Sequence, residues 1–194
     1  MSLLQVEDVV VQFGGVTAVN HATFEVVAGS VTGLIGPNGA GKTTCFNVIT
    51  GLQRPTSGHA RFDGRDITRT AVHRRARRGI GRTFQRLEAF GSLTVRDNVR
   101  VAHDIHAGLI GLVRPSRGDV DGLLERVGIA AYADERADSI PTGVARLLEL
   151  ARCLAGDPQL LLLDEPSSGQ DETETEAFGD LLRALASEGC GILM

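Results

Sequence analysis

The chain is poor in lysine, aromatic residues and cysteine, and it lacks long apolar runs. Of its 194 residues, 20 are basic, and Lys42 is the single lysine among them; aromatic residues make up 4%. The formal net charge of −4 gives no global attraction to nucleic acid. No apolar stretch reaches the ~18 residues that a membrane-spanning helix needs. These absences disfavour a nucleic-acid-binding protein and an integral membrane protein.

The cysteines and the N-terminus bear on where the protein works. Cys45, Cys153 and Cys190 are odd in number, far apart and without CxxC spacing. They therefore indicate reduced thiols rather than a disulfide framework or a zinc site. The opening "MSLLQVEDVV" lacks a basic segment followed by an apolar core, so it does not predict a signal peptide. We expect a cytoplasmic protein.

The segment "GPNGAGKTT" has the glycine spacing of a phosphate-binding loop. Glycines let backbone N–H groups point at phosphate oxygens, and the start of the following helix adds positive partial charge. Lys42 supplies a compact point charge, which suits a narrow loop better than the planar arginine fork. Thr43 is expected to bind Mg²⁺ and Thr44 to donate to the α-phosphate region. The predicted nucleotide-binding residues of the loop are Gly36, Pro37, Asn38, Gly39, Ala40, Gly41, Lys42, Thr43 and Thr44.

The order of the predicted elements indicates an α/β fold. β-rich runs fill residues 3–35 and end in "SVTGLIG", which predicts a buried strand entering the loop. "KTTCFNVITG" has helical spacing and ends at a glycine. Residues 94–155 have helical period with glycine stops, which predicts a helical subdomain. "QLLLLDEP" reads as a strand buried in a parallel sheet, "DETETEAFGDLLRALASEG" as a helix, and "CGILM" as the start of another strand.

Asp164 and Glu165 end the "LLLLDE" strand. Asp164 is placed to hold a magnesium ion, usually through water, and Glu165 to orient or deprotonate the attacking water. The alternative is a pair of solvated turn residues, and the phosphate loop upstream favours the catalytic interpretation.

Two charged segments are interpreted as ordinary helices. "HRRARRG", residues 73–79, predicts a solvated short helix rather than a nucleic-acid site, because no aromatic stacking platform accompanies it. "GVARLLELARCLAG" predicts an amphipathic helix. Its expected core face is Val144, Leu147, Leu148, Ala151 and Leu154, with Arg146, Glu149 and Arg152 pointing away.

Together, "GPNGAGKTT", "RTFQ", "GVARLLELARCLAGDPQLLLLDEP" and "SSGQD" stand in an order and spacing that resembles the ATP-binding subunits of ABC transporters. "PTSGHARFDGRDIT" and "HRRARRGIGRTFQ" further resemble the branched-chain amino-acid importer subfamily. The resemblance implies a P-loop NTPase (RecA-like) core with an N-terminal antiparallel β layer and a helical subdomain. It places the core at residues 1–86 and 157–194 and the helical subdomain at 87–156.

The resemblance also implies roles for individual residues. Phe13 matches the aromatic that stacks on adenine, with a core position in the β layer as the alternative. Gln85 matches the glutamine that senses magnesium and water, the alternative being a solvated loop residue. The dimer-interface loop matches Ser168, Gly169, Gln170 and Asp171, although Asp171 would also suit a helix N-cap.

The sequence departs from the family pattern at two places. The signature loop, in which a serine and helix N–H groups grip the γ-phosphate of the opposite subunit, aligns with Ile140, Pro141, Thr142, Gly143 and Val144. Pro141 removes a hydroxyl and an N–H, while Thr142 offers a hydroxyl one residue later; proline is tolerated in the first helical turn, so we expect the helix to form. The switch histidine would follow "CGILM", which makes the sequence C-terminally truncated relative to the family.

The implied function is an ATPase subunit, with ATP and Mg²⁺ as cofactors, that powers uptake of branched-chain or related amino acids. Its expected partners are a second ATP-binding subunit, membrane permease subunits and, indirectly, a periplasmic or extracellular solute-binding protein, with no nucleic acid. The expected location is the cytoplasmic face of the membrane, attached through the permease. The alternatives are an ATP-binding regulatory module with weak hydrolysis and the ATPase of another system such as lipopolysaccharide export.

Overall fold

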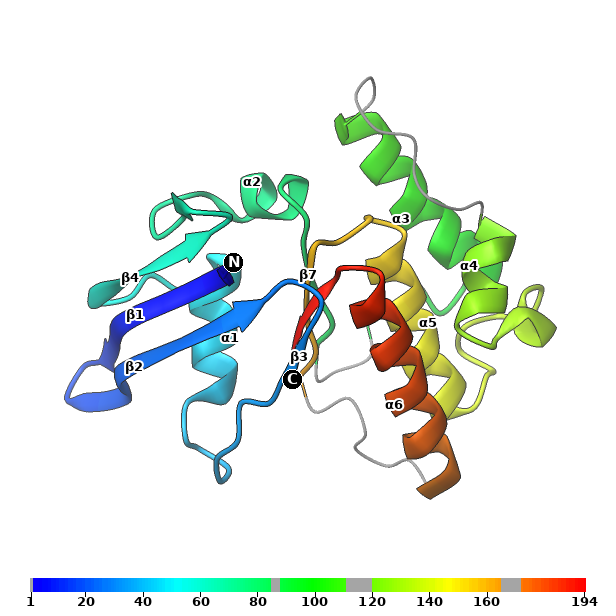
Figure 1. Ribbon diagram of the computed structural model, residues 1–194. Helices are drawn as coiled ribbons and strands as arrows, with labels where there is room; N and C mark the ends of the chain where they lie inside the picture. Colours follow the sequence, from blue (N-terminus) through cyan, green and yellow to red (C-terminus); the bar gives the residue numbers. More distant parts are fainter. Residues whose placement is uncertain (1, 85–87, 111–119, 165–171) are drawn as a thin grey trace. The chain divides into compact units, whose positions relative to one another are not determined.

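Figure 1 shows the computed structural model of the protein, which describes residues 2–84, 88–110, 120–164 and 172–194. The residues form two compact units. The first comprises residues 1–80, 159–162 and 182–194, and the second comprises residues 81–158 and 163–181. None of the helices in the described ranges is long and apolar enough to cross a bilayer.

An antiparallel sheet opens the first unit. Strands β1 (Ser2–Phe13), β2 (Val16–Val27), β4 (Ser57–Phe62) and β5 (Arg65–Asp66) follow the order β2-β1-β4-β5. Leu4 pairs with Phe62 and Val6 with Ala60 across β1 and β4, and all four side chains are buried. This alternation of inward apolar residues is the pattern of a sheet with one covered face. The predicted N-terminal β layer is confirmed.

The second sheet is parallel where its pairing is described. Its strands β3 (Val31–Thr32), β8 (Gly191–Leu193), β7 (Leu160–Leu162) and β6 (Ile80–Arg82) follow the order β3-β8-β7-β6. Every residue of β7 and β8 is buried, as the apolar runs predicted. The buried strand predicted over "SVTGLIG" is wrong in length and burial, because β3 has two residues and pairs only with β8. Ile35 in this run is 96% exposed.

Helix α1 (Lys42–Thr50) supplies the apolar residues that join the two sheets into one core. Phe46 and Ile49 are buried in the same cluster as residues of both sheets. The helix ends at Gly51, whose left-handed φ of 87° lets its N–H bond to the carbonyls of Asn47 and Val48. The predicted helix with its glycine stop is confirmed.

Helix α2 (Val72–Arg77) covers the predicted arginine run, but one of its arginines is not solvated. Arg75 is 2% exposed, and its guanidinium donates to the carbonyls of Val48 and Ile49 at 2.6 and 2.8 Å. It also donates to the carbonyls of Thr70 and Thr68 at 2.8 and 3.1 Å. Burial lowers the pKa of Arg75 to about 10, which leaves it charged at neutral pH. Arg75 therefore caps the C-terminal end of α1, where a cation also complements the helix dipole.

The second unit is mainly helical, as predicted for residues 94–155. Helices α3 (Val95–Ile110), α4 (Val120–Arg126) and α5 (Thr142–Leu154) contact one another, and a short 3-10 helix, η1, spans Ala130–Tyr132. Val99, Leu124, Ile129 and Leu148 are fully buried in it. Helix α6 (Glu172–Ser187) begins in this unit and ends in the first. The domain boundaries predicted at residues 86/87 and 156/157 stay a proposal.

Candidate nucleotide-binding site

The glycine loop lies where the sequence predicted it, between β3 and α1. Gly39 and Gly41 have φ of 85° and 86°, values that favour glycine, and Gly41 is the N-cap of α1. Residues 37–40 are exposed, and so is Thr43 in the first helical turn. The loop therefore presents backbone groups and the start of a helix to solvent, which fits the phosphate groups of a nucleotide.

Lys42 is held by the loop itself. Its Nζ donates to the carbonyl of Gly36 at 2.5 Å and to that of Pro37 at 3.3 Å. The ammonium group therefore lies against the beginning of the loop, close to the backbone that would surround a phosphate. A compact cation in this place can form charge-assisted hydrogen bonds with the oxygens of a phosphate chain.

Gly41 has a second role, which the motif did not reveal. A side chain at this position would collide with the carbonyl of Ala18 in β2 and touch the Val19 side chain. The antiparallel sheet therefore packs directly against the end of the loop, and only glycine permits the contact. Sequence reasoning missed this because the contact joins residues more than twenty positions apart.

Phe13 lies at the end of β1, opposite Val16 in the hairpin. Its side chain is 51% exposed, so the alternative that it belongs to the core of the β layer is wrong. An exposed aromatic side chain on this sheet is free to stack on a flat ligand, and adenine stacking stays a prediction.

Asp164 follows β7 in the second unit, buried at 5% exposure. Its Oδ2 accepts a hydrogen bond from the Arg82 guanidinium at 3.1 Å, and both side chains are almost completely buried. Desolvation is the largest cause of the lowered pKa of Arg82, and the hydrogen bond and charge of Asp164 oppose it. The alternative of a solvated turn residue is wrong for Asp164. A role in magnesium binding stays a prediction.

The signature segment forms the start of α5, so the expected helix is confirmed. Pro141 occupies the N-cap position with φ −59° and ψ 152°, one residue before the first helical turn in which we expected it, and its carbonyl accepts the Ala145 N–H at 2.9 Å. Thr142 is the first helical residue and is exposed, whereas Gly143 and Val144 are half-buried. Proline is compatible with this position because its fixed φ suits the entry to a helix.

Several predicted site residues lie outside the described residues. These are Gln85, Glu165 and the dimer-interface residues Ser168, Gly169, Gln170 and Asp171. Their roles stay predictions.

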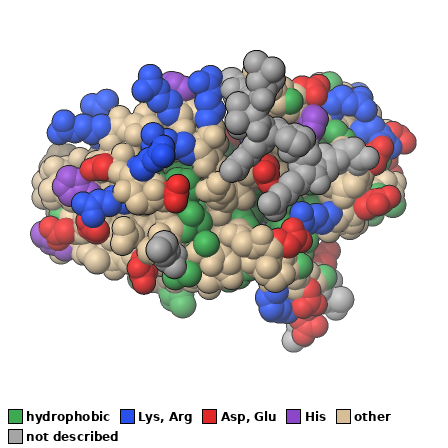
Figure 2. Space-filling model, turned by 45° about the horizontal axis from the view of Figure 1, so that its top comes forward, with side chains coloured by type: hydrophobic (Ala, Val, Ile, Leu, Met, Phe, Trp, Pro, Cys, Tyr) green, Lys and Arg blue, Asp and Glu red, His purple; other side chains and the backbone are tan. Residues whose placement is uncertain are grey.

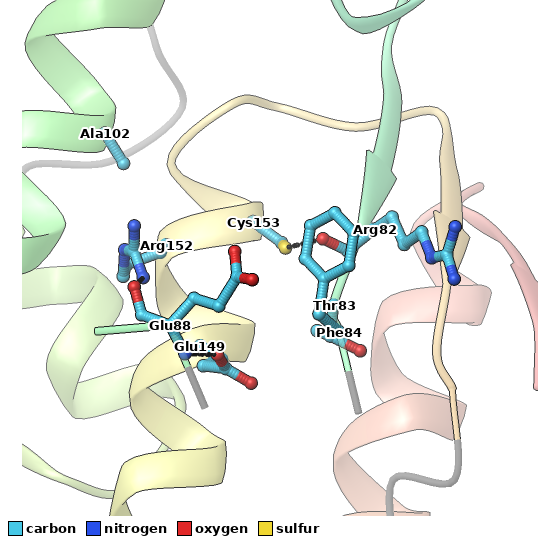
Figure 3. A pocket seen from close by; sticks show the side chains of 8 residues that line it. All are labelled: Arg82, Thr83, Phe84, Glu88, Ala102, Glu149, Arg152 and Cys153. Carbon is cyan, nitrogen blue, oxygen red and sulfur yellow. Dashed lines mark hydrogen bonds between the residues drawn. The ribbon is translucent and has the colours of Figure 1, made fainter. Parts of the chain in front are cut away.

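The second unit also contains a pocket of about 180 Å³ next to the described end of "RTFQ". Figure 3 shows its lining, which comes from β6 and the residues after it, from α3 and from α5. The lining residues are Arg82, Thr83, Phe84, Glu88, Ala102, Glu149, Arg152 and Cys153. Burial raises the pKa of the Cys153 thiol to about 12, so this thiol is neutral. All three cysteines of the protein are free, as predicted.

Two side chains of α5 hold the backbone of Glu88. The Glu149 carboxylate accepts the Glu88 N–H at 2.6 Å, and Arg152 donates to the Glu88 carbonyl at 2.8 Å. Arg152 also lies over the Phe90 ring, 5.1 Å from its centroid. Glu149 is only 7% exposed, so the prediction that it points away from the packed face is wrong. The backbone N–H of a distant loop provides the partner that makes its burial tolerable.

Comparison with known proteins identifies the family. The model of the ABC transporter family matches residues 19–168. BraF of Pseudomonas aeruginosa, a high-affinity branched-chain amino-acid transport ATP-binding protein, is 37% identical over 96% of this chain and 78% of its own length. The chain belongs to the ABC transporter family. LivG of Escherichia coli, with the same description, is 37% identical over 94% of the chain and 76% of its own length.

Solved structures agree with this assignment. The ABC cassette MJ1267 superposes with a TM-score of 0.87 at 28% identity, covering the whole of this protein and 81% of its own length. The predicted α/β nucleotide-binding fold is thereby confirmed, and the chain is shorter than these relatives. Members of the family are ATPases coupled to transport, so this chain is the ATPase subunit of a transporter.

We expect Glu149 to make the stability of this ABC ATPase depend on pH. Desolvation is the largest cause of its raised pKa, opposed by the Glu88 N–H and by Arg152. The folded protein therefore keeps a proton that the unfolded chain has released, in the window between the unfolded and folded pKa values. The free energy of unfolding should rise as pH falls through this window.

In Glu149→Gln this dependence should be absent, because an amide does not titrate and its oxygen still accepts the Glu88 N–H. Urea unfolding between pH 4.5 and 7 measures the difference, and the gap between the two proteins should narrow as pH falls. Glu149→Ala is the control: compared with Glu149→Gln, it should be less stable by about 1–3 kcal/mol at every pH, because the buried Glu88 N–H has no acceptor. Parallel pH profiles for the unmodified protein and Glu149→Gln would show that Glu149 is not the titrating group.

Proposed function

We propose that this ABC ATPase powers an importer of branched-chain or related amino acids. The observation that carries the proposal is its similarity to BraF and LivG over nearly all of its length. The exposed glycine loop with Lys42 supports ATP as the ligand. The amino acid would be bound by a membrane permease and a solute-binding protein, which this subunit would serve from the cytoplasmic face of the membrane.

The proposed site residues bind ATP, hold Mg²⁺ or activate the attacking water. Lys42 and the loop N–H groups would hold the phosphates, and Phe13 would stack on adenine. Thr43, Asp164 and Gln85 offer the oxygen ligands that Mg²⁺ prefers, and the ion would neutralise phosphate charge during transfer. Glu165 would orient or deprotonate the attacking water. Because Arg82 already neutralises one oxygen of Asp164, a magnesium ion would share this carboxylate with Arg82.

The permease contact is proposed at the pocket beside "RTFQ" and the following segment "RLEAFGSLTV". Phe84 and Phe90 are 39% and 48% exposed, and Arg152 and Glu88 add polar groups beside them. Exposed aromatic side chains with a charged rim are typical of protein interfaces. A helix or loop of the permease is the proposed occupant.

A permease assay tests this function directly. The ATPase, its permease and the solute-binding protein are reconstituted in vesicles, and phosphate release is measured at saturating ATP. We expect several-fold stimulation when the binding protein carries leucine, isoleucine or valine. Glu165→Gln is the control, because it should still bind ATP and the permease but hydrolyse ~100-fold more slowly or worse. If only solutes of another class stimulated phosphate release, the amino-acid assignment would be overturned, while the role as a transporter ATPase would stand.

The signature segment makes a separate prediction about the dimer. We propose that the exposed Thr142 hydroxyl reaches a nucleotide bound by a second subunit, in the place of the serine that Pro141 removes. Thr142→Ala should therefore weaken ATP-dependent dimerisation more than it weakens ATP binding to the monomer. Size-exclusion chromatography with ATP and a monomer titration measure the two quantities. An equal loss in both would mean that Thr142 only supports the local fold.

A further inference from the structure

Residues 65–78 of the first unit have a charge opposite to that of the whole protein. They hold six arginines against one aspartate, a net charge of +5 in a protein whose total is −4, so all other residues together carry −9. Arg75 is buried at the end of α1, and the other five arginines are exposed. We call these five the arginine patch: Arg65, Arg69, Arg74, Arg77 and Arg78.

The arginine patch is not neutralised within the part of the protein that the structure describes. None of its five side chains forms an ion pair or a side-chain hydrogen bond with another described residue. Arg61, Arg100 and Arg136 differ, because each is exposed and paired with a carboxylate. Figure 2 shows Lys and Arg side chains gathered over the region of α2 and the β4–β5 hairpin. Unpaired guanidinium groups concentrated on one surface favour a phosphate-bearing partner.

The single acidic residue in the segment is already engaged. Asp66 accepts the Thr68 N–H at 2.7 Å and lies 3.2 Å from His59 Nδ1. Hydrogen bonding by Thr68 is the largest cause of the lowered pKa of Asp66, and His59 lowers it further. Asp66 is therefore directed at its own turn and at His59.

We propose that the arginine patch binds anionic lipid headgroups of the membrane on which the transporter works. This inference rests on the proposed function, because it places the ATPase at a membrane surface. A negatively charged membrane attracts nearby basic residues, and the attraction fades within a Debye length of ~10 Å. The patch can therefore lie on the surface while the acidic remainder of the protein stays largely screened from it.

The composition of the segment favours a membrane over nucleic acid. Residues 65–78 contain no phenylalanine, tyrosine or tryptophan on which a base could stack. Val72, the first residue of α2, is 40% exposed and offers an apolar contact at the headgroup level instead. The charge of −9 on the other residues would repel a long polyanion that wraps around the protein.

Vesicle sedimentation with this protein tests the proposal. Vesicles of pure phosphatidylcholine are compared with vesicles containing about 30% phosphatidylglycerol, in roughly 100 and 500 mM salt, a range over which screening changes strongly. Arg74→Gln, Arg77→Gln and Arg78→Gln are combined in one variant, the patch variant. The control variant combines Arg61→Gln, Arg100→Gln and Arg136→Gln, which removes the same formal charge from paired positions. Circular dichroism and nucleotide titration check that both variants fold.

We expect the unmodified protein to bind the anionic vesicles at low salt and to be released at high salt. The patch variant should bind them about tenfold more weakly or worse, and the control variant should change by less than about twofold. Equal binding by both variants, or binding that ignores phosphatidylglycerol, would overturn the proposal. If the patch variant loses binding to a single strand of about 20 nucleotides while its vesicle binding is unchanged, the patch is a nucleic-acid site and the proposal is overturned. Permease-stimulated phosphate release, measured separately, shows whether the proposed function fails as well.

Discussion

Lys42→Ala should lower the affinity for ATP by about 100-fold or more. Lys42 is the only lysine of the protein, and its ammonium group lies against the carbonyls of Gly36 and Pro37 in the loop. Charge-assisted hydrogen bonds contribute about 1.5–3 kcal/mol each, and this cation is expected to serve two phosphates. Titration with a fluorescent ATP analogue, followed by competition with ATP, measures the loss.

Two further variants separate charge from shape. Lys42→Arg keeps the charge but introduces a planar fork that is larger than the loop accommodates, so most of the affinity should still be lost. Arg54→Ala removes an exposed cation just beyond α1 and should leave the affinity within about twofold. ATP affinity that is unchanged in Lys42→Ala, with the fold intact, would remove the phosphate-loop assignment.

The loop and the buried strands could be predicted because their signals are local. The glycine spacing fixes the turn before α1, and an uninterrupted apolar run is sufficient to indicate β7 and β8. The sequence places Asp164 directly after such a strand but does not predict that its side chain is buried. Its partner Arg82 could not be predicted, because the pair joins residues 82 positions apart.

Glu149 shows why helical periodicity misjudged one face of α5. The expected apolar stripe treats the helix as packed on one side, whereas its buried residues include Ala145, Leu148, Glu149 and Leu150. These positions cover a wider arc, because α3, α4 and the segment around Glu88 all lie against α5. The available signal was the spacing of Glu149 and Arg152, three residues apart on one helix. Both side chains bond to the backbone of Glu88.

The arginine run gave no local sign of which residue would be buried. Four arginines stand within residues 74–78, and a six-residue helix has too few turns for its period to distinguish them. Arg75 is the buried one because its guanidinium donates to carbonyl groups at the end of α1, 26 and 27 positions earlier in the sequence. Gly51 completes the arrangement, because a side chain there would collide with the Arg75 guanidinium.

Arg75→Ala should therefore destabilise the protein by roughly 3 kcal/mol or more, among the larger effects of a single substitution. The substitution removes a buried cation that donates to four carbonyls and leaves the last carbonyls of α1 without it. Each buried acceptor that loses its donor costs about 1–3 kcal/mol, and the volume of the missing side chain adds to this. Urea unfolding followed by circular dichroism measures the change in the free energy of unfolding.

Arg77→Ala is the matched control, since Arg77 lies two residues further along the same helix and is exposed. It should change the free energy of unfolding by about 0.5 kcal/mol or less. Arg75→Lys should fall between the two, because an ammonium group keeps the charge near the helix end but cannot reach all four carbonyls that the guanidinium joins. Equal stability of Arg75→Ala and Arg77→Ala would mean that water replaces the guanidinium at no cost.

Arg75 caps the end of α1, and the same helix begins at the phosphate loop. If Arg75 holds this helix in place, ATP affinity should fall in Arg75→Ala under conditions where the variant is still folded. ATP affinity should not fall in Arg77→Ala.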